Sequence, residues 1–244
     1  MTELDQTDSE IGDQALREKL ILAHKILLAS GVLQQNLGHA SIRLQGGKQI
    51  LIMGHLHDVG KTFEMVNTED LSVMDLDGNH IGGQLEPPGE RYNHTGIYNA
   101  RSEINAVVHC HPIISTAFTI ANRDIIPVGR FGGCFYPKVP VYQKSIQVET
   151  PKIGAEIAKT LGDAPAVMLK HHGATCVGKT IEQAVAVAIT LEDTARFLHI
   201  AYNLGTPEPL PFEEIDTDRA LKLDRPSFSS NPWTYWTEQV TKGQ

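Results

Sequence analysis

Two histidines with one residue between them, His109 and His111, stand at the end of a run of apolar and β-branched residues in the segment AVVHCHPII (106–114). In a β-strand the side chains at positions i and i+2 lie on the same face, so both imidazoles are expected to reach one metal ion. Spacing alone leaves a second interpretation open, because isolated histidines commonly pack in a core or lie on the surface. The pair is therefore a candidate chelate.

Further candidate ligands stand elsewhere in the chain. A second strand-like run, PAVMLKHHG, ends in His171 and His172, and Glu90 lies near the start of a predicted helix. Neutral imidazoles with a carboxylate suit Zn²⁺ best, and Mn²⁺, Fe²⁺ and Co²⁺ accept the same ligands. The sequence predicts one metal site only if the fold brings these residues together.

The elements that must position them follow from periodicity and turn residues. Helices are predicted at 13–30, about 90–101, 151–161 and 181–204. Hairpins are predicted at Gly46-Gly47 and at Asp77-Gly78, which indicates antiparallel strands. The runs INAVVHCH and PAVMLKHHG are typical of strands that are buried on both faces. These patterns predict one domain in which helices cover a mixed sheet.

The last part of the chain has a different composition. The segment GTPEPLPFEEIDTD, which begins at Gly205, is rich in proline and acid. We therefore predict a domain over 1–205, and an excursion and tail over 206–244 that packs on the same domain or on a neighbouring subunit. Three aromatic residues of the tail, Trp233, Tyr235 and Trp236, are candidates for subunit packing or for an apolar lid over a substrate ring.

Composition limits the classes of function. The 244 residues carry a net charge of -8, so the chain has no general attraction for nucleic acid or anionic membranes. Its three cysteines, an odd number in apolar contexts, are typical of a reduced, cytoplasmic protein. The polar, acidic start does not resemble a signal peptide, and no run is long enough to span a membrane. We expect a cytoplasmic protein that acts on small molecules.

Two segments, PPGERYNHTGIYNARSEINAVVHCHP and VMLKHHGATCVGKTIEQAVAVAITLEDTARF, resemble the class II aldolase/adducin family, which includes L-fuculose-1-phosphate aldolase and related metal-dependent lyases. The resemblance implies a single-domain three-layer α/β/α sandwich with a largely antiparallel mixed sheet, usually assembled as a homotetramer with sites between subunits. It also implies a zinc or similar ion on His109, His111 and His172, with Glu90 as acid/base and as an additional ligand when the site is empty. Adducin-like relatives lack the three histidines, which favours an enzyme over a scaffold.

The expected chemistry is cleavage of a carbon–carbon bond. An ion on three histidines has open positions for a substrate carbonyl and a neighbouring hydroxyl, and it stabilises the enolate that cleavage leaves behind. Glu90 is expected to transfer the proton, with a pKa raised by burial. We predict a retro-aldol lyase of the fuculose-1-phosphate aldolase type in carbohydrate metabolism. The alternatives are a decarboxylase of a hydroxylated aromatic or pyridine carboxylic acid and a non-catalytic, adducin-like scaffold; iron-dependent oxygen chemistry, known in a few family members, also fits the ligands.

The sequence departs from the sugar-phosphate aldolases where those enzymes hold phosphate. It has Gly38-His39 where they typically have Gly-Asn, and LIMGHLHDVGK where they have a Thr-Pro-Ser-Gly-like turn. Pro88-Gly89 replaces the pair of serines that precedes their glutamate. A phosphate site built from hydroxyls and amides would lose several donors here. These differences favour the decarboxylase alternative, whereas the family name favours the aldolase.

Four residues are candidates for substrate binding. The position of the proton-donating tyrosine of the aldolases falls on Arg130, whose guanidinium suits a carboxylate, although a surface ion pair is an equally open interpretation. His94 lies four residues after Glu90, so it is predicted to position that carboxylate or a substrate oxygen, with packing as the alternative. Gly38 and His39 belong to the loop that touches substrate in relatives.

Overall fold

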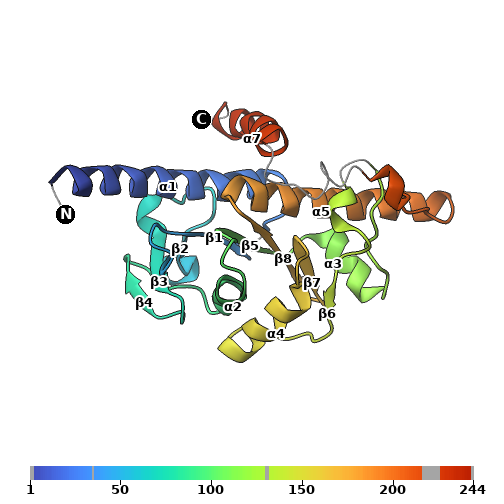
Figure 1. The fold of residues 1–244 in the computed structure, drawn as a ribbon, viewed down its shortest axis with the longest axis horizontal. Helices are drawn as coiled ribbons and strands as arrows, with labels where there is room; N and C mark the ends of the chain where they lie inside the picture. Colours follow the sequence, from blue (N-terminus) through green and yellow to red (C-terminus); the bar gives the residue numbers. More distant parts are fainter. Residues whose placement is uncertain (1–2, 35, 130–131, 216–225, 243–244) are drawn as a thin grey trace.

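The computed structural model describes residues 3–34, 36–129, 132–215 and 226–242 (Figure 1). Its strands form one eight-stranded sheet in the order β4-β3-β2-β1-β5-β8-β7-β6. Every neighbouring pair is antiparallel except β6 and β7. The strands are β1 (His39–Arg43), β2 (Gln49–Met53), β3 (Leu71–Asp75), β4 (His80–Gly82), β5 (Ala106–Cys110), β6 (Val141–Tyr142), β7 (Ala166–Leu169) and β8 (Gly173–Gly178). The predicted mixed, largely antiparallel sheet is confirmed.

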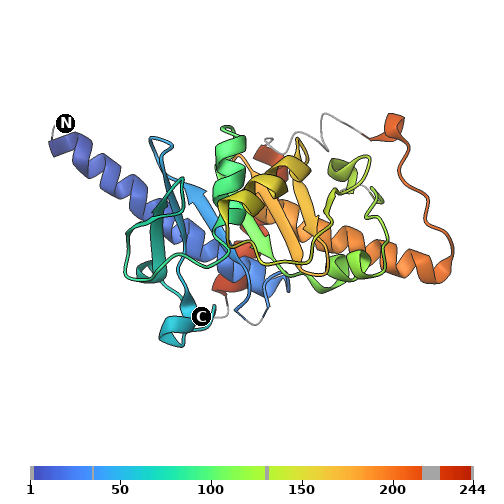
Figure 2. The same cartoon turned by 90° about the horizontal axis from the view of Figure 1, so that it is seen from below.

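Helices cover both faces of the sheet (Figures 1 and 2). The α-helices are α1 (Glu3–Ala29), α2 (Tyr92–Ala100), α3 (Ile113–Ile120), α4 (Pro151–Leu161), α5 (Ile181–Leu204) and α7 (Pro226–Thr241). Short 3₁₀ turns are η1 (Leu56–Val59), η2 (Thr68–Asp70), η3 (Gly132–Phe135) and η4 (Phe212–Glu214). Helices α1 and α5 lie over one face, and α2 and α4 lie over the other. The predicted three-layer α/β/α fold is confirmed.

Strand β5 shows how the sheet separates two apolar cores. Ala106, Val108 and Cys110 belong to the larger core, which includes α1 and α5. Val107 belongs to the second core, between the sheet and the helices α2 and α4. Because successive side chains of a strand alternate between faces, His109 points toward the second core. The prediction that this strand is buried on both faces is confirmed.

Several predicted elements match the structure closely. Helix α5 covers the predicted range 181–204, and α4 begins at Pro151 after Thr150, whose side chain accepts a hydrogen bond from the Ile153 amide. Helix α1 begins ten residues earlier than the periodic segment 13–30 indicated. Strand β8 and helix α3 were not predicted.

Helices α2 and α4 cross with their backbones in contact. A Cβ atom added to Gly96 would overlap the backbone of Gly154, and one added to Gly154 would overlap the Tyr92 carbonyl. Only glycine lets two helices approach this closely. The contact holds α2, and the segment that enters it, firmly against α4.

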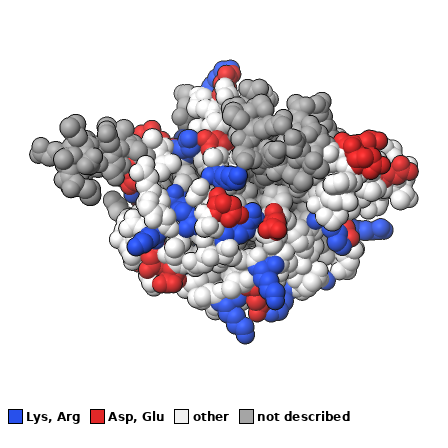
Figure 3. Space-filling model, viewed as in Figure 1, with Lys and Arg blue, Asp and Glu red and all other residues white. Residues whose placement is uncertain are grey.

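The surface carries mixed charge on the face shown in Figure 3, where basic and acidic side chains are interspersed. Within the described part of the chain, no helix has an apolar stretch long enough to cross a membrane.

Helix α7 contacts α1 and α5, and its Trp233, Trp236 and Val240 side chains pack against the larger core. The domain boundary at residue 205 stays a prediction.

A buried histidine joins α1 to β1 and gives the fold a dependence on pH. The Nδ1 atom of His24 donates to the Leu20 carbonyl at 2.8 Å, and its Nε2 atom accepts from the Ala40 amide at 3.0 Å. Burial lowers the pKa of His24 to about 4, although the hydrogen bond to Leu20 acts in the opposite direction. The unfolded chain therefore binds one more proton than the folded chain between about pH 6.5 and pH 4.

The free energy of unfolding should consequently fall as the pH drops from 6.5 to 4, by about 3 kcal/mol from His24. In the His24→Gln variant this part of the pH dependence is expected to disappear. Urea unfolding at pH 7 and at pH 4.5 measures it, and His199→Gln, at an exposed position of α5, is the matched control. An unchanged difference between the two pH values in His24→Gln would contradict the assignment.

Candidate metal centre

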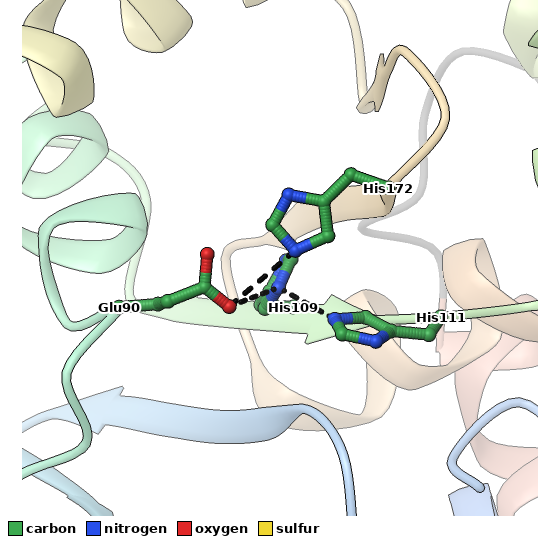
Figure 4. A group of neighbouring side chains, drawn as sticks. All are labelled: Glu90, His109, His111 and His172. Carbon is green, nitrogen blue, oxygen red and sulfur yellow. Dashed lines mark hydrogen bonds and ion pairs between the residues drawn. The ribbon is translucent and has the colours of Figure 1, made fainter. Parts of the chain in front are cut away.

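Four side chains converge at one end of the sheet (Figure 4). Glu90, His109, His111 and His172 each offer one ligand atom, and these atoms all lie within 4.8 Å of one another. The Nε2 atoms of His109 and His111 are 3.0 Å apart, and Glu90 Oε2 lies 3.3 Å from His109 Nε2 and 3.4 Å from His172 Nε2. These three separations are close to the edge of about 3.4 Å that a tetrahedral ion with bonds of about 2.1 Å requires.

Two of the histidines are oriented by backbone carbonyls. The Nδ1 atom of His109 donates to the Ala174 carbonyl at 3.0 Å, and that of His172 donates to the Ile146 carbonyl at 3.1 Å. Each donation places the proton on Nδ1 and leaves Nε2 facing the cluster. This second hydrogen bond is typical of metal-binding histidines, whose tautomer and ring orientation it fixes. The donor set thus fits a divalent metal ion.

The pKa values of His111 and His172 are shifted in opposite directions. Burial, with the neighbouring imidazoles of His109 and His172, lowers the pKa of His111 to about 3, so it is neutral at pH 7. Burial also acts to lower the pKa of His172, but Glu90 outweighs it and raises that pKa. A neutral imidazole is the form that binds metal.

His172 lies in a tight turn between β7 and β8, which pair up to Leu169 and Gly173. The strand-like run was predicted to end in His171 and His172; the structure shows a turn there, with His171 at a φ of 59°. His171 is exposed and lies outside the cluster. A left-handed residue reverses the chain here, which a pattern of apolar residues does not reveal.

Glu90 reaches the cluster from the segment just before α2. Its Oε1 atom accepts a hydrogen bond from the Val148 amide at 2.9 Å, so one oxygen is anchored while the other faces the histidines. The expectation of a raised pKa was wrong for this arrangement. Burial acts to raise the pKa of Glu90, but hydrogen bonds with His109 and His172 outweigh it and hold that pKa well below its usual range.

His39 and His94 form a buried chain of hydrogen bonds beside the cluster. The Nδ1 atom of His39 lies 2.7 Å from His94 Nε2, and the Ser41 hydroxyl lies 2.7 Å from His94 Nδ1 and 2.8 Å from the Tyr98 hydroxyl. The His39 ring centroid is 5.3 Å from that of His109. Burial lowers the pKa of both His39 and His94. His94 was predicted to position Glu90 or a substrate oxygen, with packing as the alternative; it is fully buried, and its hydrogen bonds are to His39 and Ser41.

A pocket with a volume of about 130 Å³ adjoins the cluster and reaches Glu90 and His111. His39 and Gly38 line it, together with His55 and His57. Gly38 has a φ of 94°, and a side chain there would collide with the His109 carbonyl. Glycine therefore lets the backbone at this position lie close to β5. His55 and His57 were not among the predicted site residues; only the folding of their loop onto the pocket reveals them.

Of the other predicted participants, Arg130 lies outside the described residues, and the aromatic residues of the tail lie away from the cluster. Helix α7 packs outside the layer of α1 and α5, whereas Glu90 reaches the cluster from the side of α2. Trp233 and Trp236 therefore do not form a lid over the cluster of their own chain. Tyr235 is exposed.

Comparison with known proteins gives consistent results. The family model described as "Class II Aldolase and Adducin N-terminal domain" matches residues 18–199. A 3,4-dihydroxyphthalate decarboxylase of Arthrobacter keyseri is 32% identical over 98% of this chain and 98% of its own. An L-fuculose phosphate aldolase of Methanocaldococcus jannaschii is 33% identical over 58% of this chain and 76% of its own.

Solved structures share the fold. An L-fuculose 1-phosphate aldolase superposes with a TM-score of 0.76 at 24% identity, covering 86% of this chain and 96% of its own. The L-fuculose 1-phosphate aldolase from Glaciozyma antarctica PI12 superposes with a TM-score of 0.79 at 23% identity, covering 96% of this chain and 93% of its own.

Proposed function

Because the chain belongs to the class II aldolase and adducin family, we propose that this metal-dependent carbon–carbon lyase decarboxylates a hydroxylated aromatic or pyridine carboxylic acid. One observation carries the choice: the decarboxylase relative aligns with 98% of the chain, tail included, whereas the L-fuculose phosphate aldolases align with 58 to 76% of it. The decarboxylase relatives from Rhodococcus jostii and Terrabacter align over similar lengths.

The loop beside the pocket supports the same choice. The amides of Gly54 and His55 donate to the carbonyls of Asp70 and Glu86 at 2.9 Å, so neither is available to a phosphate. The Lys61 ammonium is paired with the buried Asp70 carboxylate at 2.7 Å. With these two amides and the cation occupied, the loop has fewer donors for a phosphate.

The remaining polar groups suit a carboxylated ring. The pocket offers the imidazoles of His39 and His57, and that of His55, whose Nδ1 atom pairs with Asp58 at 3.0 Å. A protonated ring nitrogen can donate a hydrogen bond to a carboxylate or phenolic oxygen. The Asn36 side chain is occupied, because it donates to the Lys61 carbonyl and accepts from the Phe63 amide. We also propose that Arg130 binds a substrate carboxylate.

The three histidines and Glu90 would hold the ion, which we propose to be Zn²⁺, with Mn²⁺, Fe²⁺ or Co²⁺ as alternatives. When bound, such an ion acts as a Lewis acid toward the substrate oxygens and stabilises the charge left on the substrate by departing carbon dioxide. The chain's own residues must then supply a proton to the ring carbon from which the carboxylate leaves.

We propose that Glu90 supplies that proton. Substrate that displaces Oε2 from the imidazoles would leave the side chain anchored through Oε1 to the Val148 amide. The hydrogen bonds that lower its pKa would then be lost, while burial, which raises the pKa, would remain. A protonated Glu90 gives its proton to the ring carbon and recovers one from water.

Retro-aldol cleavage of a sugar phosphate is the second candidate function, and the likeness to L-fuculose phosphate aldolases favours it. A homotetramer and a cytoplasmic location are further proposals that rest on the family resemblance and on composition. Exposed apolar side chains next to the site on α3, Ile113 and Ile120, are consistent with burial in an assembly.

The test is a comparison of two substrate panels with the metal-loaded protein. We expect carbon dioxide release from hydroxy-aryl dicarboxylates such as 3,4-dihydroxyphthalate, loss of this activity after removal of the metal with a chelator, and recovery when the metal is restored. No turnover is expected with L-fuculose 1-phosphate. Release of an aldehyde from the sugar phosphate, without carbon dioxide from the aryl acids, would establish the second candidate instead.

A further inference from the structure

Helix α3 begins immediately after the candidate ligand His111, and its first turn is bound by a distant carboxylate. Pro112 occupies the N-cap position and has no side-chain acceptor for the first free amides of the helix. Glu192 of α5 supplies it: Oε1 accepts from the Ile114 amide at 2.9 Å, and Oε2 accepts from the Ser115 amide at 2.9 Å and from the Ser115 hydroxyl at 2.6 Å.

This contact is buried and directional. The Glu192 side chain is 4% exposed, and Ser115 is fully buried. A carboxylate at a helix N-terminus is also stabilised by the helix dipole. The proline ring fixes φ at Pro112, so the chain has little freedom between His111 and the first turn of α3. The position of α3 therefore sets the position of the His111 backbone.

The other end of α3 holds the second ligand segment. The Thr119 hydroxyl oxygen accepts a hydrogen bond from the His171 amide at 2.9 Å, while the hydroxyl donates to the Thr116 carbonyl at 2.7 Å. His171 is the left-handed residue of the turn that presents His172. A left-handed conformation is unfavourable for a residue with a side chain, so it needs a fixed partner.

We propose that Glu192 and Thr119 are positioning residues of the metal centre, which act through α3 to set the distance between His111 and His172. This inference rests on the proposed metal site but not on the identity of the substrate. Helix α3 connects the two segments that carry the ligands. Glu192 holds the end of α3 that follows His111, and Thr119 holds the turn that carries His172 against the other end. Loss of either contact would let one imidazole move relative to the other.

The expected effect is a weaker and altered metal site in a folded protein. Outer partners of metal ligands commonly contribute about 10- to 100-fold to metal affinity. We expect Thr119→Val to lower the affinity for Co²⁺ about tenfold and to change the visible absorption spectrum of the cobalt-loaded protein. Thr119→Ser, which keeps the hydroxyl, should restore both. Glu192→Gln should act in the same direction, because an amide cannot accept all three hydrogen bonds.

The matched control is Thr194→Val, which removes a buried hydroxyl on α5 that donates within its own helix, to the Thr190 carbonyl. Thermal melting of the metal-free proteins separates loss of stability from loss of metal geometry. Wild-type affinity and spectrum in both Thr119→Val and Glu192→Gln would overturn the proposal, as would a wild-type protein that binds no Co²⁺. If the wild type binds Co²⁺ but decarboxylates no aryl acid, only the proposed function fails.

Discussion

The His109→Ala variant is expected to bind a divalent metal ion more than about 100-fold less tightly than the wild type and to lose measurable turnover. Loss of an outer partner already costs up to about this factor, so loss of a ligand should exceed it. His109 is the most constrained of the four: its ring is fully buried, its Nδ1 atom is bound to the Ala174 carbonyl, and its Nε2 atom lies at hydrogen-bond distance from His111.

Metal content by mass spectrometry and affinity by competition with a chromogenic chelator measure this effect. His199→Ala is the matched control, because it removes an exposed imidazole of α5 that lies outside the cluster. His172→Ala, at a half-buried position, should reproduce the loss with less disturbance of the core. Retention of a full equivalent of tightly bound metal in His109→Ala would exclude this cluster as the site.

The second large effect is expected for Glu90→Gln, in which turnover should fall about 10²- to 10⁴-fold, the range for loss of a general acid or base. Glutamine can still accept from the Val148 amide, so the side chain keeps its anchor but has no acidic proton to deliver. Three imidazoles remain, and the metal should therefore be retained, with an affinity lowered by no more than about tenfold.

Steady-state kinetics together with metal analysis separates these two consequences. Glu86→Gln is the control, since this glutamate is exposed and pairs with His80 rather than with the cluster. Full turnover by Glu90→Gln with its metal bound would show that the proton comes from elsewhere. A variant without metal would instead make Glu90 mainly a ligand.

Local patterns in the sequence predicted the elements that carry their own signals. Helix α5 has a side-chain cap at Thr180 and an apolar face, and β5 is an uninterrupted apolar run, so both appear where periodicity placed them. The pair of His109 and His111 could be predicted because side chains two residues apart in a strand lie on the same face.

The missed elements depend on partners far away in the sequence. Helix α3 has proline in place of a capping side chain, and its cap is Glu192, which is 77 residues beyond Ser115. Strand β8 has glycine at both ends and is paired on both sides, so its structure comes from β5 and β7 rather than from its own residues. His55 and His57 join the pocket only because their loop folds over β2. Tertiary contacts of this kind leave no local pattern.

The glycine contact between α2 and α4 restricts how the specificity of such a lyase can diverge. Because Gly96 and Gly154 meet backbone to backbone, no larger residue fits at either position without moving the segment that holds Glu90. New substrates would therefore be accommodated by substitutions in the loop around His55 and His57. The side chains of this loop line the pocket but do not hold a helix in place. Homologues that differ in substrate should vary in this loop and keep both glycines.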